Sequence, residues 1–158
     1  MNRSGAGSVL VVVALAVAGC AGSSPAHVST PDLAKRYMSI ATPANTVLDK
    51  SFDALSDHKR DGDGVSASVP LLRTIALTER TFDRELLALK LPAQMGTTAA
   101  ALVTANEARG NLTTQATTAT SVPSLNQYET ELDAMNAPVE AQVRILRKDL
   151  GLPPSDTD

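Results

Sequence analysis

The feature of this sequence that most constrains its fold is a helical spacing of apolar residues, clearest near the C-terminus. Apolar side chains recur there every three or four residues, and polar side chains occupy most of the positions between them. A segment with this period buries one face as an α-helix, whereas a half-buried strand would need strict alternation. The apolar positions are Leu125, Tyr128, Leu132, Met135, Val139, Val143, Leu146 and Leu150.

Three earlier segments show the same spacing. The first is expected to begin at Thr30, with Pro31 at the first helical position, and to run to about Leu55. Its apolar phase continues across Pro43, which predicts one helix kinked at the proline. Pro138 predicts a similar kink in the last helix.

Turn-forming residues bound the other segments. The second helix is expected to start at Ser68, after a hydrophilic loop over residues 57–68. The third is expected over residues 93–119. The last is expected to start at Ser124, where a capping box begins, and to stop at Gly151.

Four amphipathic helices joined by short loops bury their apolar stripes together as an antiparallel bundle. No segment alternates apolar and polar residues for long enough to be a strand. The sequence therefore predicts an all-α fold, an antiparallel four-helix bundle over residues 30–151. Residues 152–158, with their proline pair, are expected to be a disordered tail.

The third predicted helix has an unusual composition. It consists mostly of Ala and Thr, with Leu102, Val103 and Leu112 as its few large residues, and Gly110 weakens its middle. Small side chains allow a neighbouring helix to pack closely. Alternatively, they leave a groove, lined by leucines of the second and fourth helices, for an acyl chain or a partner's helix.

The N-terminal residues have the three zones of a secretory signal. Arg3 gives a positive start, an unbroken run of ten apolar residues follows over residues 9–18, and small residues precede Cys20. Such a run is too short to span a bilayer, which takes about 20 residues. It fits the apolar core of a signal peptide, which is expected over residues 1–19.

Cys20 turns this expectation from secretion to lipid anchoring. The sole cysteine of the chain follows Val17, Ala18 and Gly19, a pattern that resembles the lipobox of bacterial lipoproteins. The resemblance implies a diacylglyceryl thioether on Cys20, cleavage before it and acylation of the new α-amine. Two or three acyl chains hold a protein at a membrane, whereas one chain binds only marginally. The alternative is an uncut N-terminal anchor helix.

The charge of the chain limits the kinds of partner that we expect. Cleavage removes only the charge of Arg3, which leaves 13 Lys plus Arg against 17 Asp plus Glu and a net charge of −4. No cluster of cations is present to neutralise phosphates, so nucleic acid is not an expected partner. Residues 20–29 are small and polar and are expected to tether the bundle to the membrane lipid.

No catalytic, metal or cofactor site is expected. Asp57, Asp61 and Asp63 resemble a calcium loop, but Lys59 or Val65 falls where a ligand is needed. A di-iron bundle needs Glu-x-x-His pairs, and neither His27 nor His58 has a Glu three residues before it. A hydrolase needs a histidine beside its nucleophile, and both histidines lie outside the predicted helices.

The last predicted helix has a polar face that includes two acidic residues. Glu129 and Asp133 lie on it, whereas Glu131 lies off it. Paired carboxylates can serve as an acid and a base. Because this face is charged along most of its length, we expect it to be solvated. It also holds Asn136, Glu140, Arg144 and Arg147.

Two further segments carry a family resemblance. Residues 41–45, Ala-Thr-Pro-Ala-Asn, and residues 143–154, which run from Val143 to Pro154, follow a lipobox in this chain. The combination resembles small mycobacterial-type lipoproteins of actinobacteria. It implies an extracytoplasmic, lipid-anchored location and transfers the role of one residue, Cys20.

Two functions remain open at this level. The first is an interaction or structural module without catalytic activity, which engages another envelope protein. The second is a carrier or sensor of a small apolar ligand held between helices. Helical stripes look alike whether they contact each other or a ligand, so the sequence does not decide between the two functions.

Overall fold

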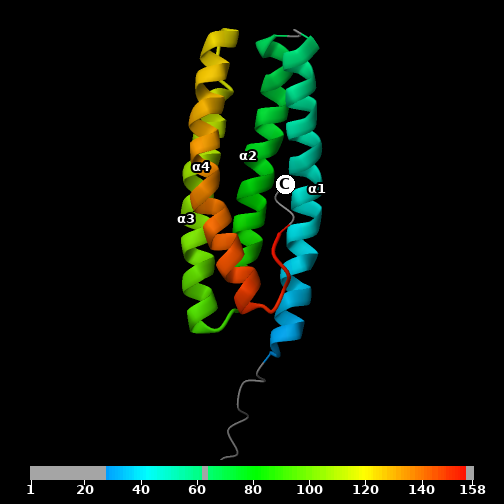
Figure 1. Cartoon of the computed structure of the whole chain (residues 1–158), viewed down its shortest axis with the longest axis vertical. Coiled ribbons are helices and arrows are strands. Elements are labelled where there is room, and N and C mark those ends of the chain that lie inside the picture. The colour runs from blue at the N-terminus through cyan, green and yellow to red at the C-terminus, as the bar shows by residue number, and fades with distance from the viewer. Residues whose placement is uncertain (1–27, 62–63, 156–158) are drawn as a thin grey trace, which may run out of the picture.

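The computed structural model describes residues 28–61 and 64–155, which form four α-helices and no strand (Figure 1). The predicted all-α four-helix bundle is confirmed. The signal segment 1–19 and Cys20 lie outside the described residues. No helix in the described part is long and apolar enough to cross a membrane. The helices are α1 (Thr30–Asp61), α2 (Val65–Ala88), α3 (Ala93–Ala116) and α4 (Val122–Asp149).

The helix ends differ from the predicted ones. α1 continues to Asp61 and α2 already starts at Val65, so most of the loop predicted over residues 57–68 is helical. Gly64 lies between them with a φ of 80°, a conformation that favours glycine. α3 ends at Ala116, three residues earlier than predicted. Hydrophilic residues at the end of a bundle are solvated equally well in a helix and in a loop. Composition alone therefore predicted these helix ends wrongly.

The start of α4 also lies earlier than predicted. Ser121 is its N-cap, and the Ser121 hydroxyl accepts a hydrogen bond of 3.3 Å from the Ser124 N–H. The predicted cap at Ser124 is therefore wrong. Pro123 explains the difference, because a proline lacks only an N–H that the first helical turn leaves unpaired anyway.

The core consists of two apolar clusters, one at each end of the bundle. The cluster nearer the start of α1 takes buried residues from all four helices, and Tyr37 and Phe82 meet in it edge to face with ring centres 6.3 Å apart. The cluster at the other end is smaller. The buried residues of the larger cluster are Leu33, Ala34, Tyr37, Ala41, Leu86, Ala99, Leu102, Val103, Val139, Leu146 and Leu150. Those of the smaller cluster are Leu55, Leu72, Ala116, Ala119 and Leu125.

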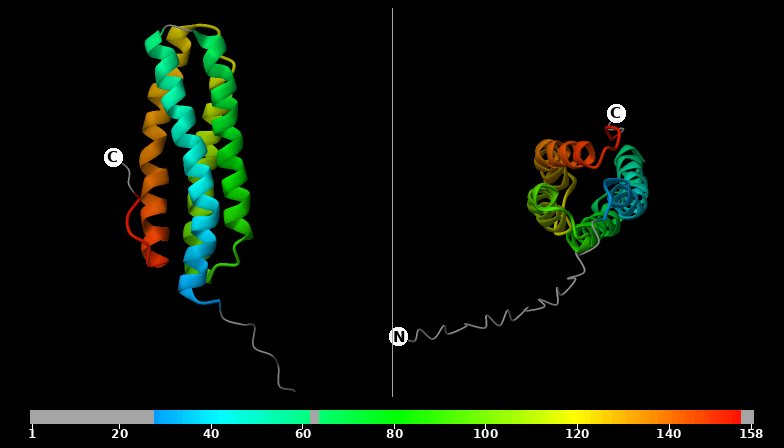
Figure 2. Two further views of the ribbon diagram at one scale, coloured as in Figure 1. Left: turned by 90° about the vertical axis from the view of Figure 1, so that its right-hand side faces the viewer. Right: turned by 90° about the horizontal axis from the view of Figure 1, so that it is seen from below.

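The four helices do not close into a complete ring of contacts. α2 packs on α1 and α3, and α3 packs on α4, whereas α1 and α4 hardly touch. The view along the bundle in Figure 2 shows the C-terminal segment running beside the gap between α4 and α1. We call this gap the α1–α4 seam.

Part of the predicted stripe of α1 is exposed. Phe52 is 42% exposed and lies at the α1–α4 seam, whereas Val47, which is similarly exposed, lines a shallow hollow beside α2. α3, in contrast, packs closely on both of its neighbours, as its small residues allow. Of the two alternatives for this helix, the structure therefore has the close packing, and the hollows open along the α1–α4 seam.

Candidate functional site

A layer of polar side chains separates the two apolar clusters. It contains Glu79 and Asp83 of α2, Asn106 and Arg109 of α3, and Asn136 of α4. Glu79, Asp83 and Asn106 are buried, and Arg109 is 14% exposed. Charged side chains are almost never fully buried unless they are paired, so this layer is the most unusual feature of the interior.

Arg109 joins three helices. Its Nη2 lies 2.8 Å from Oε1 of Glu79 and donates a hydrogen bond of 3.3 Å to the side-chain oxygen of Asn106. Its Nη1 donates a hydrogen bond of 3.1 Å to the side-chain oxygen of Asn136. Asn106 in turn donates a bond of 2.9 Å to Asp83. A guanidinium suits this position because its planar fork presents donors in several directions at once.

The pairing of Glu79 is incomplete. Its side chain is 1% exposed, and Oε1 is ion-paired with Arg109 at 2.8 Å. Glu79 Oε2 and the Arg109 Nε have no hydrogen-bond partner within residues 28–61 and 64–155. Burial raises the pKa of Glu79, and the charge of Arg109 opposes that rise. Each unpaired buried polar atom costs about 1–3 kcal/mol.

Asp83 is also buried with incomplete hydrogen bonding. Burial raises its pKa to about 6, against the lowering effect of the hydrogen bond from Asn106. Asp83 Oδ2 has no hydrogen-bond partner in the described part of the chain. With two carboxylates and one guanidinium, the layer attracts protons or hydrogen-bond donors.

Gly110 makes room for this layer. A Cβ built at this position would lie 3.2 Å from Oε2 of Glu79. The glycine that weakens α3 by composition therefore brings the α3 backbone close to the Glu79 carboxylate.

The two larger hollows along the α1–α4 seam share Arg109 on their floor. The one nearer the smaller cluster has a volume of about 260 Å³, with Phe52, Leu55, Leu72 and Leu132 as its apolar wall. The other, of about 500 Å³, is lined by polar and apolar residues of α1 and α4. Glu79 also lines the smaller hollow. The seam therefore leads from solvent to the polar layer.

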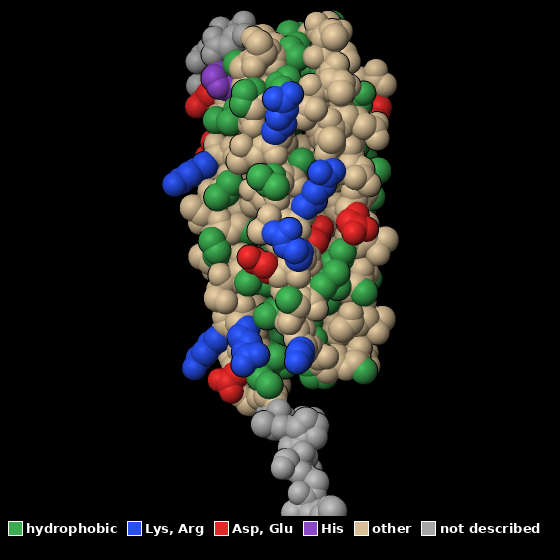
Figure 3. All heavy atoms as spheres, turned by 180° about the vertical axis from the view of Figure 1, so that it is seen from behind, with side chains coloured by type: hydrophobic (Ala, Val, Ile, Leu, Met, Phe, Trp, Pro, Cys, Tyr) green, Lys and Arg blue, Asp and Glu red, His purple; other side chains and the backbone are tan. Residues whose placement is uncertain are grey.

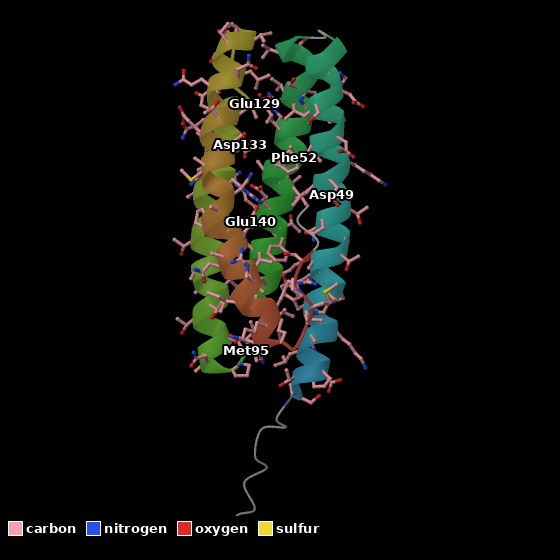
Figure 4. All side chains as sticks on the ribbon, viewed as in Figure 1. Asp49, Phe52, Met95, Glu129, Asp133 and Glu140 are labelled. Atoms are coloured by element: carbon pink, nitrogen blue, oxygen red, sulfur yellow. The ribbon has the colours of Figure 1, made fainter. Side chains whose placement is uncertain are left out.

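The predicted polar face of α4 is only partly solvated. Glu129 and Asp133 line the smaller hollow, with Glu129 half-buried and Asp133 exposed. Figure 4 shows both on α4, with Phe52 and Asp49 on α1 at the other side of the seam. Glu131 is exposed and accepts a hydrogen bond of 3.1 Å from Gln127. The expectation of a fully solvated face is wrong for Glu129, because the open seam gives α4 a second interior side.

The C-terminal segment covers part of the seam. Arg147 donates hydrogen bonds of 2.8 and 3.4 Å to the carbonyl oxygens of Pro153 and Pro154, and contacts the sulfur of Met38 on α1. Leu152 packs against the larger cluster, and Ser155 lines the larger hollow. The tail predicted to be disordered from residue 152 thus contacts the bundle through residue 155, because Arg147 holds its backbone.

Of the other candidate residues, Asp57 lies near the end of α1, whereas the side chain of Asp61 and the whole of Asp63 and His27 lie outside the described part of the chain. His58 is half-buried at the end of α1. No group of three or more His, Cys, Asp or Glu suited to a metal occurs among the residues that the structure describes.

Sequence reasoning did not single out Glu79, Asp83, Asn106 or Arg109. A signal was present, since Glu79 falls at a helical interval between Leu72 and Leu86, where the apolar stripe of α2 should continue. A polar residue within a stripe marks a buried polar group or a break in the core.

Comparison with known proteins gives no match: no protein family, curated protein or solved structure is significantly similar to the chain. The fold and the site alone therefore define the class. The chain is a four-helix bundle with one open seam and an ionic layer on the floor of that seam.

Proposed function

We propose that this chain is a lipid-anchored interaction module of the cell envelope, without catalytic activity, that holds a segment of a partner protein in the α1–α4 seam. One observation carries the proposal: three helix pairs are packed, whereas the seam is open and exposes Phe52 at its edge. An exposed aromatic side chain beside a hollow is typical of a recognition site. The anchor rests on the lipobox that ends at Cys20.

The chemistry of the seam fits a polypeptide. Its wall offers apolar contacts, and its floor offers Arg109 and Asn136 for polar contacts. Pro153 and Pro154 lie against the bundle, and their carbonyl oxygens accept hydrogen bonds from Arg147. The chain thus holds a backbone segment of its own at one end of the seam, and a partner segment in the rest would make contacts of the same kind.

The test is photo-crosslinking in living cells at one position in the seam and one outside it. A photoreactive phenylalanine derivative replaces Phe52, and in a control chain it replaces Thr104, which is exposed on α3. We expect one protein to be crosslinked reproducibly from position 52 and not from position 104. The same products from both positions, or no reproducible product, would contradict the proposal.

The anchor has its own measurement. The mass of the denatured protein, extracted gently from its membranes, should equal residues 20–158 plus acyl groups. An unprocessed chain of 158 residues would refute the anchor and leave the crosslinking result unaffected.

A carrier of a small amphipathic ligand is the second candidate. The smaller hollow favours it, because an apolar wall lies beside the Glu79–Arg109 pair. Its volume of about 260 Å³ is just below the usual range for ligand pockets, about 300–1,000 Å³. A native mass that includes a defined extra species would favour the carrier over the interaction module.

A further inference from the structure

The outer face of α2 carries a row of cations and leucines. Arg73, Leu77, Arg80, Arg84 and Leu87 follow one another at intervals of three and four residues. At 3.6 residues per turn these five positions fall within an arc of about 80°, so they form one stripe along the helix. We call it the α2 stripe. All five side chains are exposed, with Leu77 at 68% and Leu87 at 59% the most exposed large apolar residues.

The arginines of the stripe are available to a partner. Within the described part of the chain, Arg80 and Arg84 donate hydrogen bonds to the hydroxyls of Thr114 and Thr81, and neither makes a salt bridge. Figure 3 shows this side of the molecule, with Lys and Arg side chains along its middle, hydrophobic side chains beside them and a few Asp and Glu side chains at mid-height.

Further apolar surface and a further positive charge lie next to the α2 stripe. A shallow, mostly apolar hollow lies beside Leu77, lined by Pro43 and Val47 of α1 and, on α2, by Glu85 as well. Lys90, just beyond the end of α2, adds a cation at the end of the bundle where α1 begins (Figure 1). That end is the one from which the chain leads back to Cys20.

The rest of the chain has the opposite charge. The whole chain has a net charge of −3 and the stripe carries three arginines, so the rest of the chain, without these three positive charges, has a net charge of −6. An anionic surface would attract the α2 stripe more strongly than the acidic remainder of the chain, and would thereby orient the molecule. Leucines within a basic stripe are the composition of helices that lie in a membrane interface.

We propose that the α2 stripe binds the anionic lipid bilayer to which the chain is anchored, so that the bundle lies with α2 against the membrane. Arg73, Arg80 and Arg84 contact lipid phosphates, and Leu77 and Leu87 enter the boundary between headgroups and acyl chains. In this orientation the outer side of α4 faces away from the membrane, since α2 and α4 lie at diagonal corners of the bundle (Figure 2). The inference rests on the proposed anchoring at Cys20.

The chain contains no tryptophan, which makes a clean probe possible. The full chain with Leu77→Trp is reconstituted in phosphatidylcholine vesicles, with or without phosphatidylglycerol, and brominated lipids quench the tryptophan if it enters the bilayer. The matched control is Ile145→Trp, at a position of α4 that is 45% exposed. We expect several-fold stronger quenching at position 77 than at position 145, and only with phosphatidylglycerol. About 1 M salt should abolish the difference, because the screening length falls to about 3 Å.

Arginine variants test the contribution of charge. Each change of Arg73, Arg80 or Arg84 to Gln should weaken the interaction about fivefold. A thermal melt of each variant shows that the bundle remains folded. Equal quenching at positions 77 and 145, or quenching that is indifferent to lipid charge, would overturn the proposal. The two proposals fail separately. A mass without acyl groups would refute the anchor, whereas the quenching at position 77 in the same sample still reports whether the α2 stripe contacts the bilayer.

Discussion

Arg109 is the residue on which the polar layer depends. It is the only cation in contact with Glu79 in the described part of the chain, and it also bonds to Asn106 and Asn136. Arg109→Met keeps much of the side-chain volume and leaves the buried Glu79 carboxylate without a counter-charge. Breaking a buried pair in this way costs about 3–5 kcal/mol, so we expect the free energy of unfolding at pH 7.5 to fall by about that amount.

A double-mutant cycle separates this effect from a loss of packing. Glu79→Gln removes the charge that Arg109 compensates, so the Glu79→Gln, Arg109→Met double variant should regain most of the stability lost by Arg109→Met. Urea denaturation of the four proteins measures the coupling between the two residues. Additive losses would mean that the two residues act independently and that the ion pair does not organise the layer.

The residues of the polar layer are the part of the site that could not be predicted from the sequence. Leu72, Ile75 and Leu86 show the inner stripe of α2 clearly, and the polar Glu79 between them reads as a gap in that stripe. The distance of 2.8 Å to Arg109 depends on how α2 and α3 pack, which no helical period encodes. Lone polar residues at inner positions therefore need to be compared between helices as possible pairs.

Among the helices, α4 offers the sharpest test of how an end is chosen. Ser121 and Ser124 both suit a capping position by type, but only Ser121 has the extended backbone of an N-cap. We expect Ser121→Ala to lower the free energy of unfolding by about 1 kcal/mol, because the Ser124 N–H loses its acceptor. Ser124→Ala should have almost no effect, because that position lies inside the first turn. Thermal melts measure both, and equal losses would contradict the assignment.

Periodicity predicted the helices themselves well and their ends poorly. The apolar spacing of α4 extends over seven turns, which no strand accommodates, so the type of this element was fixed by its sequence. The end of α1 contains polar residues such as Asp57 and His58, whose side chains can be solvated in either a helix or a loop. Their conformation follows from the packing of α1 on α2, beyond the reach of a local pattern.

On the scale of the whole molecule, the open seam was the least predictable feature. All four helices carry apolar stripes, and closed and open bundles share that pattern. Phe52 belongs to the stripe of α1, and only the structure shows that it lies at a gap between α1 and α4. The seam admits solvent to a polar layer in mid-bundle, and the stability of the whole fold is linked to the protonation of that layer.

The direction of this linkage follows from the raised pKa values of Glu79 and Asp83. A carboxyl group whose pKa is higher in the folded than in the unfolded chain binds a proton more tightly when folded. Its ionised form therefore destabilises the fold at a pH above the folded pKa, and this penalty fades as the pH falls toward the unfolded value. For Asp83 the window extends from about 6 down to its usual 3.8.

We expect the bundle to become more stable as the pH falls from about 7 to about 4.5. The share of Asp83 is about 2 kcal/mol, since each unit of pKa shift corresponds to about 1.4 kcal/mol and most of its shift is traversed. Asp83→Asn keeps an oxygen that accepts the hydrogen bond from Asn106 and removes the ionisable group. This variant should therefore be more stable than the wild type near pH 7, with a flatter pH profile measured by urea denaturation. A profile that the substitution leaves unchanged would show that Asp83 is not the group that titrates, and it would move the linkage to Glu79 and its pairing with Arg109.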